Sequence, residues 1–337
     1  PTLQAKSPED WPAAAVMTPE APASRPAPTA PETDPPLAAR ASGDAEADPS
    51  PAASAPGAVH WALPEELRAA RRTLERSHAV LRGDPDHVAA LRDQLAALVA
   101  LQRWSEAADT LGRLVQLRPD EAALPFEHGT MLMQARRWSD AIPVLRGIVA
   151  REPEHGRAWF NLATAHQALG HLGEALAAWN RTLTLTPETG GPAAERAAYA
   201  ARGEVLLDLG DWDAAAADFE RVLAAEPDAT DALLNLALAR QRGGRPEEAR
   251  GVLAERAARD PRNLAVLTRL AQMAWEACLA ASDGAATTDT HTRSAGAGLC
   301  VEALDWCERG LAVDPGNREL RALREAIEGE RPASPDR

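Results

Sequence analysis

The chain has 337 residues, a formal net charge of -14 and no cluster of basic residues. This balance argues against nucleic acid as a partner, because binding to nucleic acid depends on neutralising phosphates. The apolar runs are short, so no segment of this sequence is expected to insert directly into a membrane. Three cysteines fit a reducing compartment better than a disulfide scaffold, which favours a cytoplasmic location. Because the chain starts at Pro1, a periplasmic or membrane-tethered protein stays open.

Residues 1–60 and residues 61–85 differ sharply in composition. Residues 1–60 form an acidic segment rich in proline and alanine, which predicts disorder with polyproline character. A plain tether is favoured over a recruitment tail for proline-binding modules. Residues 61–85 are highly charged with apolar residues at helical spacing, and we expect one helix there that enters the following array.

From residue 85 onward the chain repeats. Prolines recur at a constant interval, pause for one longer step after the fourth, and then resume with the original spacing: Pro85, Pro119, Pro153, Pro187, Pro227 and Pro261. Trp104, Trp138 and Trp212 each stand at the same distance before one of these prolines, at the start of a stretch with helical periodicity. This pattern predicts stacked helix pairs, each closed by a proline that cannot extend the second helix.

Residues 156–187 carry the fullest version of the repeat and resemble the tetratricopeptide repeat, a helix-turn-helix unit with the same period. The large, small, glycine and proline positions of that family are filled by Trp159, Leu162, Ala163, His166, Gly170, Ala175, Trp179 and Pro187. Five further units follow the same register, which gives six repeats over residues 88–317. The resemblance implies an all-α fold, a right-handed superhelical solenoid of such repeats.

Two departures from the period predict irregular segments. The longer proline interval places an extra loop at 188–193, and a run of small and polar residues predicts a disordered insertion at 280–297 between helices at 264–279 and 299–313. Cys278 and Cys300 flank this insertion and could close it in an exported protein. Three small buried apolar cysteines are the favoured expectation. A capping helix is predicted at 318–330, followed by a tail at 331–337.

The sequence offers little chemistry. The only concentration of histidines, at His155, His166 and His171, lacks the cysteine or carboxylate spacing that would complete a metal set. No phosphate-binding glycine loop or nucleophile motif is present in the sequence. We therefore expect no enzyme, no metal and no cofactor.

The resemblance implies that function lies in a concave groove lined by the first helix of each repeat. Carried onto this chain, the lining is predicted to consist of Phe126, Thr130, Met133, Arg157, Phe160, Asn161, Thr164, Gln167, Glu204, Asn235, Leu238, Gln241 and Trp275, with Leu207 and Gln272 in the same register. Asn161 and Asn235 resemble groove asparagines that hold a peptide backbone. Phe126, Met133 and Phe160 could anchor apolar side chains, and Arg157 could bind a carboxylate.

The sequence thus predicts a protein-interaction scaffold or adaptor that binds an extended peptide or a helix of a partner, in the assembly of a larger complex. One alternative is a regulatory or substrate-docking module of an enzyme whose catalytic part is absent from this chain. Another is a structural subunit of a membrane- or envelope-associated complex. A repeat fold serves many roles, so the partner itself is not specified.

Overall fold

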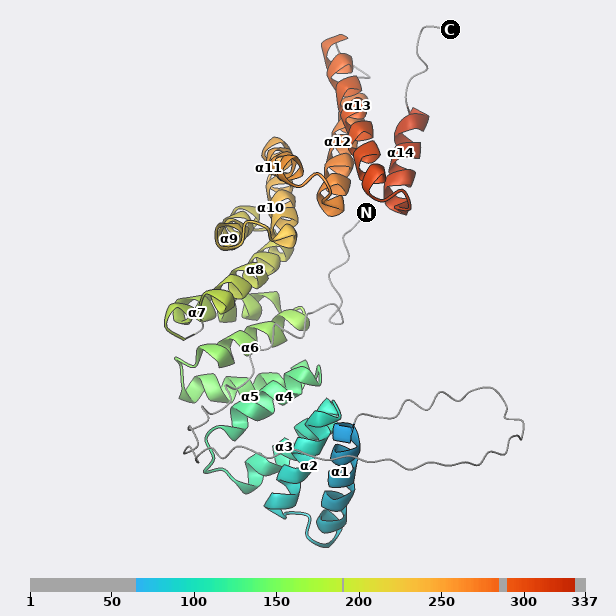
Figure 1. Ribbon diagram of the computed structural model, residues 1–337. Helices are drawn as coiled ribbons and strands as arrows, with labels where there is room; N and C mark the ends of the chain where they lie inside the picture. Colours follow the sequence, from blue (N-terminus) through green and yellow to red (C-terminus); the bar gives the residue numbers. More distant parts are fainter. Residues whose placement is uncertain (1–64, 190, 285–289, 331–337) are drawn as a thin grey trace, which may run out of the picture. The chain divides into compact units, whose positions relative to one another are not determined.

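The computed structural model describes residues 65–189, 191–284 and 290–330 (Figure 1). Every regular element in these ranges is an α-helix, which confirms the predicted all-α fold. The predicted disordered segment at 1–60 and the tail at 331–337 lie outside the described residues. Within the described ranges the chain forms two compact units, 65–121 and 122–330, which we treat separately.

The smaller unit is a stack of three helices, α1 (Glu65–Gly83), α2 (Val88–Ala100) and α3 (Trp104–Leu117). Each packs against the next, with Leu74, Leu91, Leu98 and Leu111 buried between them. The buried side of α1 carries Ala70, Leu74 and Ser77, and the Ser77 Oγ donates to the carbonyl oxygen of Leu74 at 2.8 Å.

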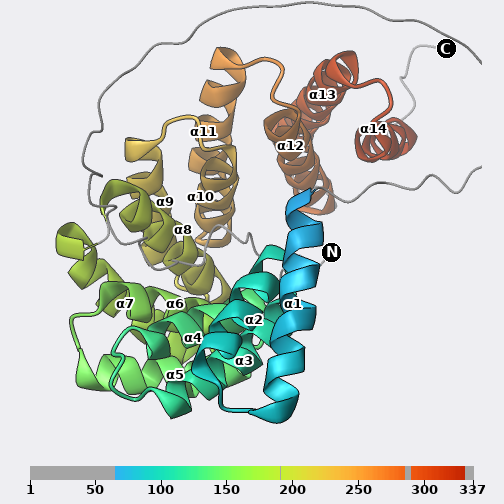
Figure 2. The ribbon, with the colours of Figure 1, turned by 60° about the horizontal axis from the view of Figure 1, so that its bottom comes forward.

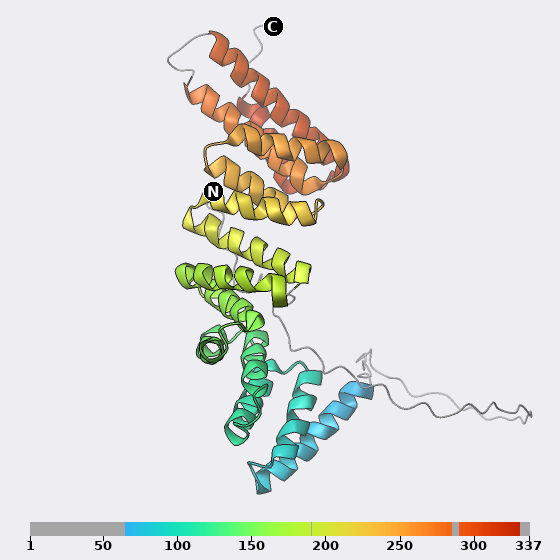
Figure 3. The same cartoon turned by 90° about the vertical axis from the view of Figure 1, so that its left-hand side faces the viewer.

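The larger unit continues the same arrangement through its described helices. In chain order these are α4 (Leu124–Gln134), α5 (Trp138–Arg151), α6 (Gly156–Ala168), α7 (Leu172–Thr189), α8 (Gly191–Leu209), α9 (Trp212–Ala225), α10 (Thr230–Arg242), α11 (Pro246–Arg259), α12 (Leu264–Gly284), α13 (Thr290–Val313) and α14 (Arg318–Glu330). Consecutive helices contact one another throughout, as the successive layers of Figure 3 show.

First helices of neighbouring repeats also contact each other. α4 contacts α6, α8 contacts α10, α10 contacts α12, and α12 contacts α14. Small residues allow this close approach, because Ala163, Ala237 and Ala271 are fully buried at the same helical position of different repeats. The first helices therefore build a continuous face from α8 to α14.

Within the helix pairs from α2–α3 to α10–α11, the turn contains one residue with a left-handed backbone conformation. Gly170, Gly210 and Gly244 occupy it with φ of 72°, 81° and 78°, a conformation that glycine adopts without a steric penalty. The earlier repeats place Gln102 and Arg136 at the same position, both with φ of 56°. The chain thus bears backbone strain at two equivalent turns.

The predicted loop at 188–193 is wrong. α7 runs through Pro187 to Thr189 and α8 begins at Gly191, so only residue 190 between them is outside the described part. Gly191 has a φ of 66° and can reverse the chain within very few residues. The alanine-rich sequence that follows has high helix propensity, so the extra residues lengthen two helices.

The predicted disordered insertion at 280–297 is also wrong over most of its length. α12 continues to Gly284 and α13 begins at Thr290, leaving 285–289 outside the described residues. Small residues cannot build a core, but alanine has the highest helix propensity, which the prediction from low hydrophobicity ignored.

The cysteines differ in part from the favoured expectation. A disulfide joins Cys278 to Cys300 across α12 and α13, with 5.3 Å between their Cα atoms. Because both helices continue past the cysteines, they hold the two Cα atoms at a distance that a disulfide spans. Cys307 alone is a free, buried cysteine, as expected for all three.

Candidate functional site

All thirteen predicted groove residues lie on first helices, but their exposure divides them into two sets. Seven side chains are buried, namely Phe126, Thr130, Met133, Phe160, Asn161, Thr164 and Gln167. Six are partly exposed, namely Arg157, Glu204, Asn235, Leu238, Gln241 and Trp275. A buried side chain presents little surface to a partner, so the prediction does not hold equally along the array.

The buried predicted residues of α6 contact neighbouring helices. Phe160 lies edge-on to Trp179 of α7, with 4.9 Å between ring centroids, and the Trp179 Nε1 donates a hydrogen bond of 2.8 Å to the Gln167 Oε1. Phe126 of α4 packs against His155, with 4.7 Å between centroids. These aromatic side chains therefore fill the repeat instead of forming open apolar pockets, which corrects their predicted role.

The buried threonines and asparagine also have internal partners. The Thr130 Oγ1 donates to the carbonyl oxygen of Phe126 at 2.9 Å, and the Thr164 Oγ1 donates to that of Phe160 at 3.0 Å. The Asn161 Nδ2 lies 3.5 Å from the Thr130 Oγ1, which connects α6 to α4. Burial of Asn161 is the clearest correction, because the resemblance assigned it to the backbone of a ligand.

The accessible residues gather on α8, α10 and α12. We name the surface that they form the first-helix face. Two rows run along it, with one residue per repeat at the same helical position, and they consist of Glu204, Leu238 and Gln272, and of Leu207, Gln241 and Trp275. Each of these side chains is partly exposed, and α10 contacts both α8 and α12. The face is therefore continuous over three repeats.

A chain of polar side chains crosses the first-helix face. The Gln241 Nε2 of α10 donates to the Glu276 Oε2 of α12 at 2.6 Å, and the Gln241 Oε1 accepts from the Arg269 Nη2. The Arg269 Nη1 donates to the Gln272 Oε1 at 3.3 Å, and the Gln272 Nε2 donates to the Glu319 Oε1 of α14 at 2.6 Å. Side-chain amides thus connect α10, α12 and α14.

Arg269 is a site residue that the sequence prediction missed. It occupies in α12 the repeat position that Asn235 has in α10, so the repeat register alone could have identified it. Burial lowers the pKa of its guanidinium from the usual value, because a desolvated cation is disfavoured. The partly buried Arg269 guanidinium donates to two amide oxygens and so places a fixed positive charge on the first-helix face.

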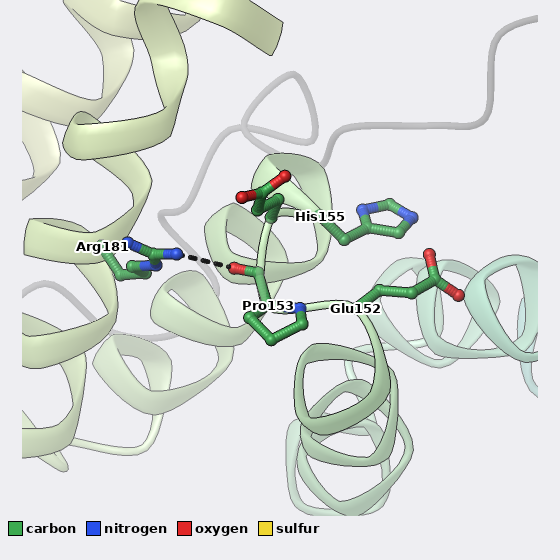
Figure 4. A pocket seen from close by; sticks show the side chains of 5 residues that line it. Glu152, Pro153, His155 and Arg181 are labelled. Carbon is green, nitrogen blue, oxygen red and sulfur yellow. Dashed lines mark hydrogen bonds between the residues drawn. The ribbon is translucent and has the colours of Figure 1, made fainter.

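A separate open depression of about 460 Å³ lies at the edge of the repeats (Figure 4). It is lined by Glu152, Pro153, Glu154 and His155, which precede α6, and by Arg181 of α7. The Arg181 Nη2 donates to the carbonyl oxygen of Pro153 at 3.2 Å. His155 caps α6 by accepting from the backbone N–H of Ala158. Both side chains are therefore engaged in the local structure.

The hydrogen bond from Arg181 to the Pro153 carbonyl has equivalents in other repeats, so it is a feature of the repeat itself. In the smaller unit, the Arg113 Nη2 donates to the Pro85 carbonyl at 2.6 Å. In the larger unit, the Arg256 Nη1 donates to the Pro227 carbonyl at 2.9 Å. An arginine of the second helix thus binds the turn that precedes the first helix in several repeats. Because the bond belongs to the repeat, we do not assign a ligand to the depression.

Two other kinds of site are missing from the described residues. Within them, no group of three or more histidine, cysteine, aspartate or glutamate side chains could hold a metal ion. No helix in the described ranges is both long and apolar enough to span a bilayer.

Comparison with solved structures returns repeat proteins at low identity. A MamA structure from Desulfovibrio magneticus RS-1 is 21% identical and covers 50% of this chain and 99% of its own, with a TM-score of 0.38. YrrB, described as a TPR protein with an unusual peptide-binding site, is 13% identical and covers 65% of this chain and 100% of its own, at 0.48. A tetratricopeptide repeat protein from Parabacteroides merdae is 14% identical and covers 77% and 99%, at 0.44. No curated protein sequence matches significantly.

The family comparison is more specific. The family model described as tetratricopeptide repeat matches residues 126–189 and 200–265. These ranges contain most of the helices from α4 to α11, including the part of the first-helix face on α8 and α10. Repeats of this family act in general as protein-interaction scaffolds. Residues 126–189 and 200–265 therefore consist of tetratricopeptide repeats.

Proposed function

We propose that this protein is an adaptor that binds an extended peptide of a partner protein on the first-helix face, in the assembly of a larger complex. The observation that carries the proposal is the row of partly exposed polar and apolar side chains on α8, α10 and α12. These helices contact one another in order, so a peptide could follow the face across three repeats.

The chemistry of the face favours an extended peptide over a helix. An extended peptide has unpaired backbone N–H and C=O groups, and a side-chain amide can serve both. Asn235 supplies such an amide. Gln241 and Gln272 already donate to Glu276 and Glu319, and each has a second amide N–H for a peptide carbonyl. A partner helix would satisfy its own backbone and require a broad apolar stripe, whereas the apolar contribution of this face comes mainly from Leu207, Leu238 and Trp275.

Trp275 and Leu238 are the expected anchors for apolar side chains of the peptide. Both are partly exposed, and a tryptophan gives a large contact area at a small cost in side-chain entropy. Trp275 also packs against the buried core of the last repeats, which fixes its position before binding.

The test is a peptide selection followed by measured affinities. Peptides from a random extended library are selected on the full chain, and their binding to Trp275→Ala and Asn235→Ala variants is measured by fluorescence anisotropy. We expect Trp275→Ala to weaken binding at least tenfold, about 1.4 kcal/mol. Val301 is exposed on the second helix α13, so Val301→Ala is the matched control and should bind as the wild type does. Equal affinity of all three variants would contradict the proposal.

A structural subunit of an envelope-associated complex is the second candidate, and one observation favours it. The Cys278–Cys300 disulfide is typical of proteins outside the reducing cytosol. Fractionation of the source cells would test this candidate, since it requires the chain to co-purify with an envelope assembly. Recovery in the cytosolic fraction alone would exclude it.

A further inference from the structure

The disulfide lies at a boundary in the last repeat. Cys278 of α12 is buried, and the next residues of that helix, from Leu279 to Ser282, are partly or fully exposed. On α13, residues 297–300 are likewise partly or fully exposed, and burial resumes at Ala303. The bond therefore joins the two helices at the point where the shared core ends.

Below the bond, packing alone accounts for the association of α12 and α13. Leu270 and Ala274 of α12 and Ala303 and Cys307 of α13 belong to one buried cluster. Figure 2 shows the two helices side by side, and they contact each other extensively. This part of the repeat has enough apolar burial to stay folded without a covalent link.

Beyond the bond, the side chains that the structure describes are all partly or fully exposed. We name residues 279–284 and 290–299, the helical segments past the disulfide, the distal hairpin. None of its side chains that the structure describes, at 279–282 and 297–299, is buried. Gly298 lies inside α13 with no atom within 4 Å of the position of a Cβ, and a glycine in a helix interior weakens the helix. Short helical segments with few buried side chains are marginal in water.

The third cysteine does not compete for the bond. Cys307 is fully buried, and this burial raises the pKa of its thiol to about 11. Thiol exchange requires a thiolate and access to the disulfide. Cys307 offers neither at neutral pH, so the Cys278–Cys300 pairing is not expected to rearrange.

We propose that the Cys278–Cys300 disulfide is a redox-sensitive staple that keeps the distal hairpin folded, and that the protein works oxidised, in an oxidising compartment. A dithiol reductant reverses it. One thiolate attacks a cystine sulfur to form a mixed disulfide and releases one protein thiolate, and the second thiol of the reductant displaces the other. The protein ends with two protonated thiols and the reductant with a disulfide. Reduction releases the distal hairpin and leaves the core of the repeat folded.

The first measurement counts thiols. Protein purified without reductant is alkylated in denaturant and analysed by mass spectrometry. We expect one modified cysteine, Cys307, in the full chain and three after treatment with dithiothreitol. Three modified cysteines before reduction would overturn the assignment of an oxidised working state.

The second measurement locates the effect of reduction. Hydrogen exchange is followed in the oxidised protein, in the dithiothreitol-treated protein and in a Cys278→Ala, Cys300→Ala variant. We expect exchange in the distal hairpin to rise at least tenfold on reduction, and that in α10 and α11 to stay within about twofold. The variant should behave as the reduced protein does. If the variant does not fold, the comparison of oxidised and reduced wild type tests the proposal by itself. The proposed role of the disulfide would be overturned if reduction left exchange in the distal hairpin unchanged. It would also be overturned if reduction accelerated exchange equally throughout the described residues of 122–330.

Discussion

At the residue scale, the most specific feature of the larger unit is a buried ion pair. Arg202 of α8 donates from Nε and Nη2 to both carboxylate oxygens of Asp218 of α9, each at 2.7 Å, and from Nη1 to the Asn180 Oδ1 of α7 at 2.7 Å. Only 3% of the Asp218 side chain is exposed. The hydrogen bond to Asp218 raises the pKa of Arg202, and an arginine guanidinium stays charged even when its partner is removed. Three helices thus meet at one cation.

Replacement of Asp218 should be severely destabilising. Asp218→Ala leaves a largely buried cation without its anion, and we expect the free energy of unfolding to fall by about 3–5 kcal/mol. Asp213 is the matched control, because it pairs with Arg245 and its side chain is 85% exposed. Asp213→Ala should cost less than about 1 kcal/mol. Urea unfolding followed by circular dichroism measures both, and equal effects would contradict the assignment.

The buried histidine His166 should make stability depend on pH. Burial lowers the pKa of its imidazole, and its Nδ1 lies 3.4 Å from the Nδ1 of His171. Protonation is therefore easier in the unfolded chain, where the pKa is about 6.5. Stability should be fully present above that pH and fall as the pH drops from about 6.5 through the lower folded value.

Urea unfolding at pH 7.5 and 5.5 tests this prediction against the His166→Phe variant. The wild type should lose stability at the lower pH, and His166→Phe should lose clearly less, because its side chain takes up no proton. His171 is exposed, so His171→Gln serves as the control and should keep most of the wild-type dependence. A variant His166→Phe with the full wild-type dependence would show that other groups are responsible.

At the element scale, the turns within the helix pairs differ in strain. Gln102 adopts a φ of 56° where later repeats have glycine. A left-handed conformation costs a non-glycine residue roughly 1–2 kcal/mol, part of which is offset by the greater chain entropy of glycine when unfolded. Gln102→Gly should therefore stabilise the smaller unit by about 0.5–1 kcal/mol. A lower thermal midpoint for this variant would contradict the strain argument.

Two glycines inside helices should respond oppositely to alanine. A Cβ added at Gly203 of α8 would lie 2.8 Å from the Phe219 Cζ, so Gly203→Ala should destabilise by about 1–3 kcal/mol through overpacking. Gly251 of α11 has no atom within 4 Å of such a Cβ, and Gly251→Ala should stabilise by up to about 1 kcal/mol. Thermal unfolding of the two variants gives the comparison, and the same sign for both would refute it.

Helix positions were predictable at this scale, and two connections were not. Tryptophan begins α3, α5 and α9 in the structure, in agreement with the sequence pattern. Pro187 does not end its helix, because a missing backbone donor weakens a helix without obliging it to stop. The insertion after residue 279 was misjudged for a related reason. Hydrophobicity indicates which segments enter a core, whereas helix formation there depends on alanine propensity.

At the scale of the whole molecule, the repeat period predicted the architecture and the helices that carry the candidate site. It could not predict which first helices stay accessible. Asn161 and Asn235 occupy equivalent repeat positions, yet Asn161 is fully buried and Asn235 is partly exposed. Exposure depends on the side chains of neighbouring repeats, and these differ between α6 and α10. The pairing of Cys278 with Cys300 could not be predicted from the sequence either, because it depends on α12 and α13 both continuing past the cysteines.

The most direct test of the central claim is a hydrogen-exchange footprint of a peptide selected on the full chain. Bound peptide should slow exchange in the first helices α8, α10 and α12, around residues 204–207, 235–241 and 269–275, and leave the second helices α9, α11 and α13 unchanged. Protection confined to the second helices, or to the smaller unit, would place the binding surface elsewhere and contradict the proposed role of the first-helix face.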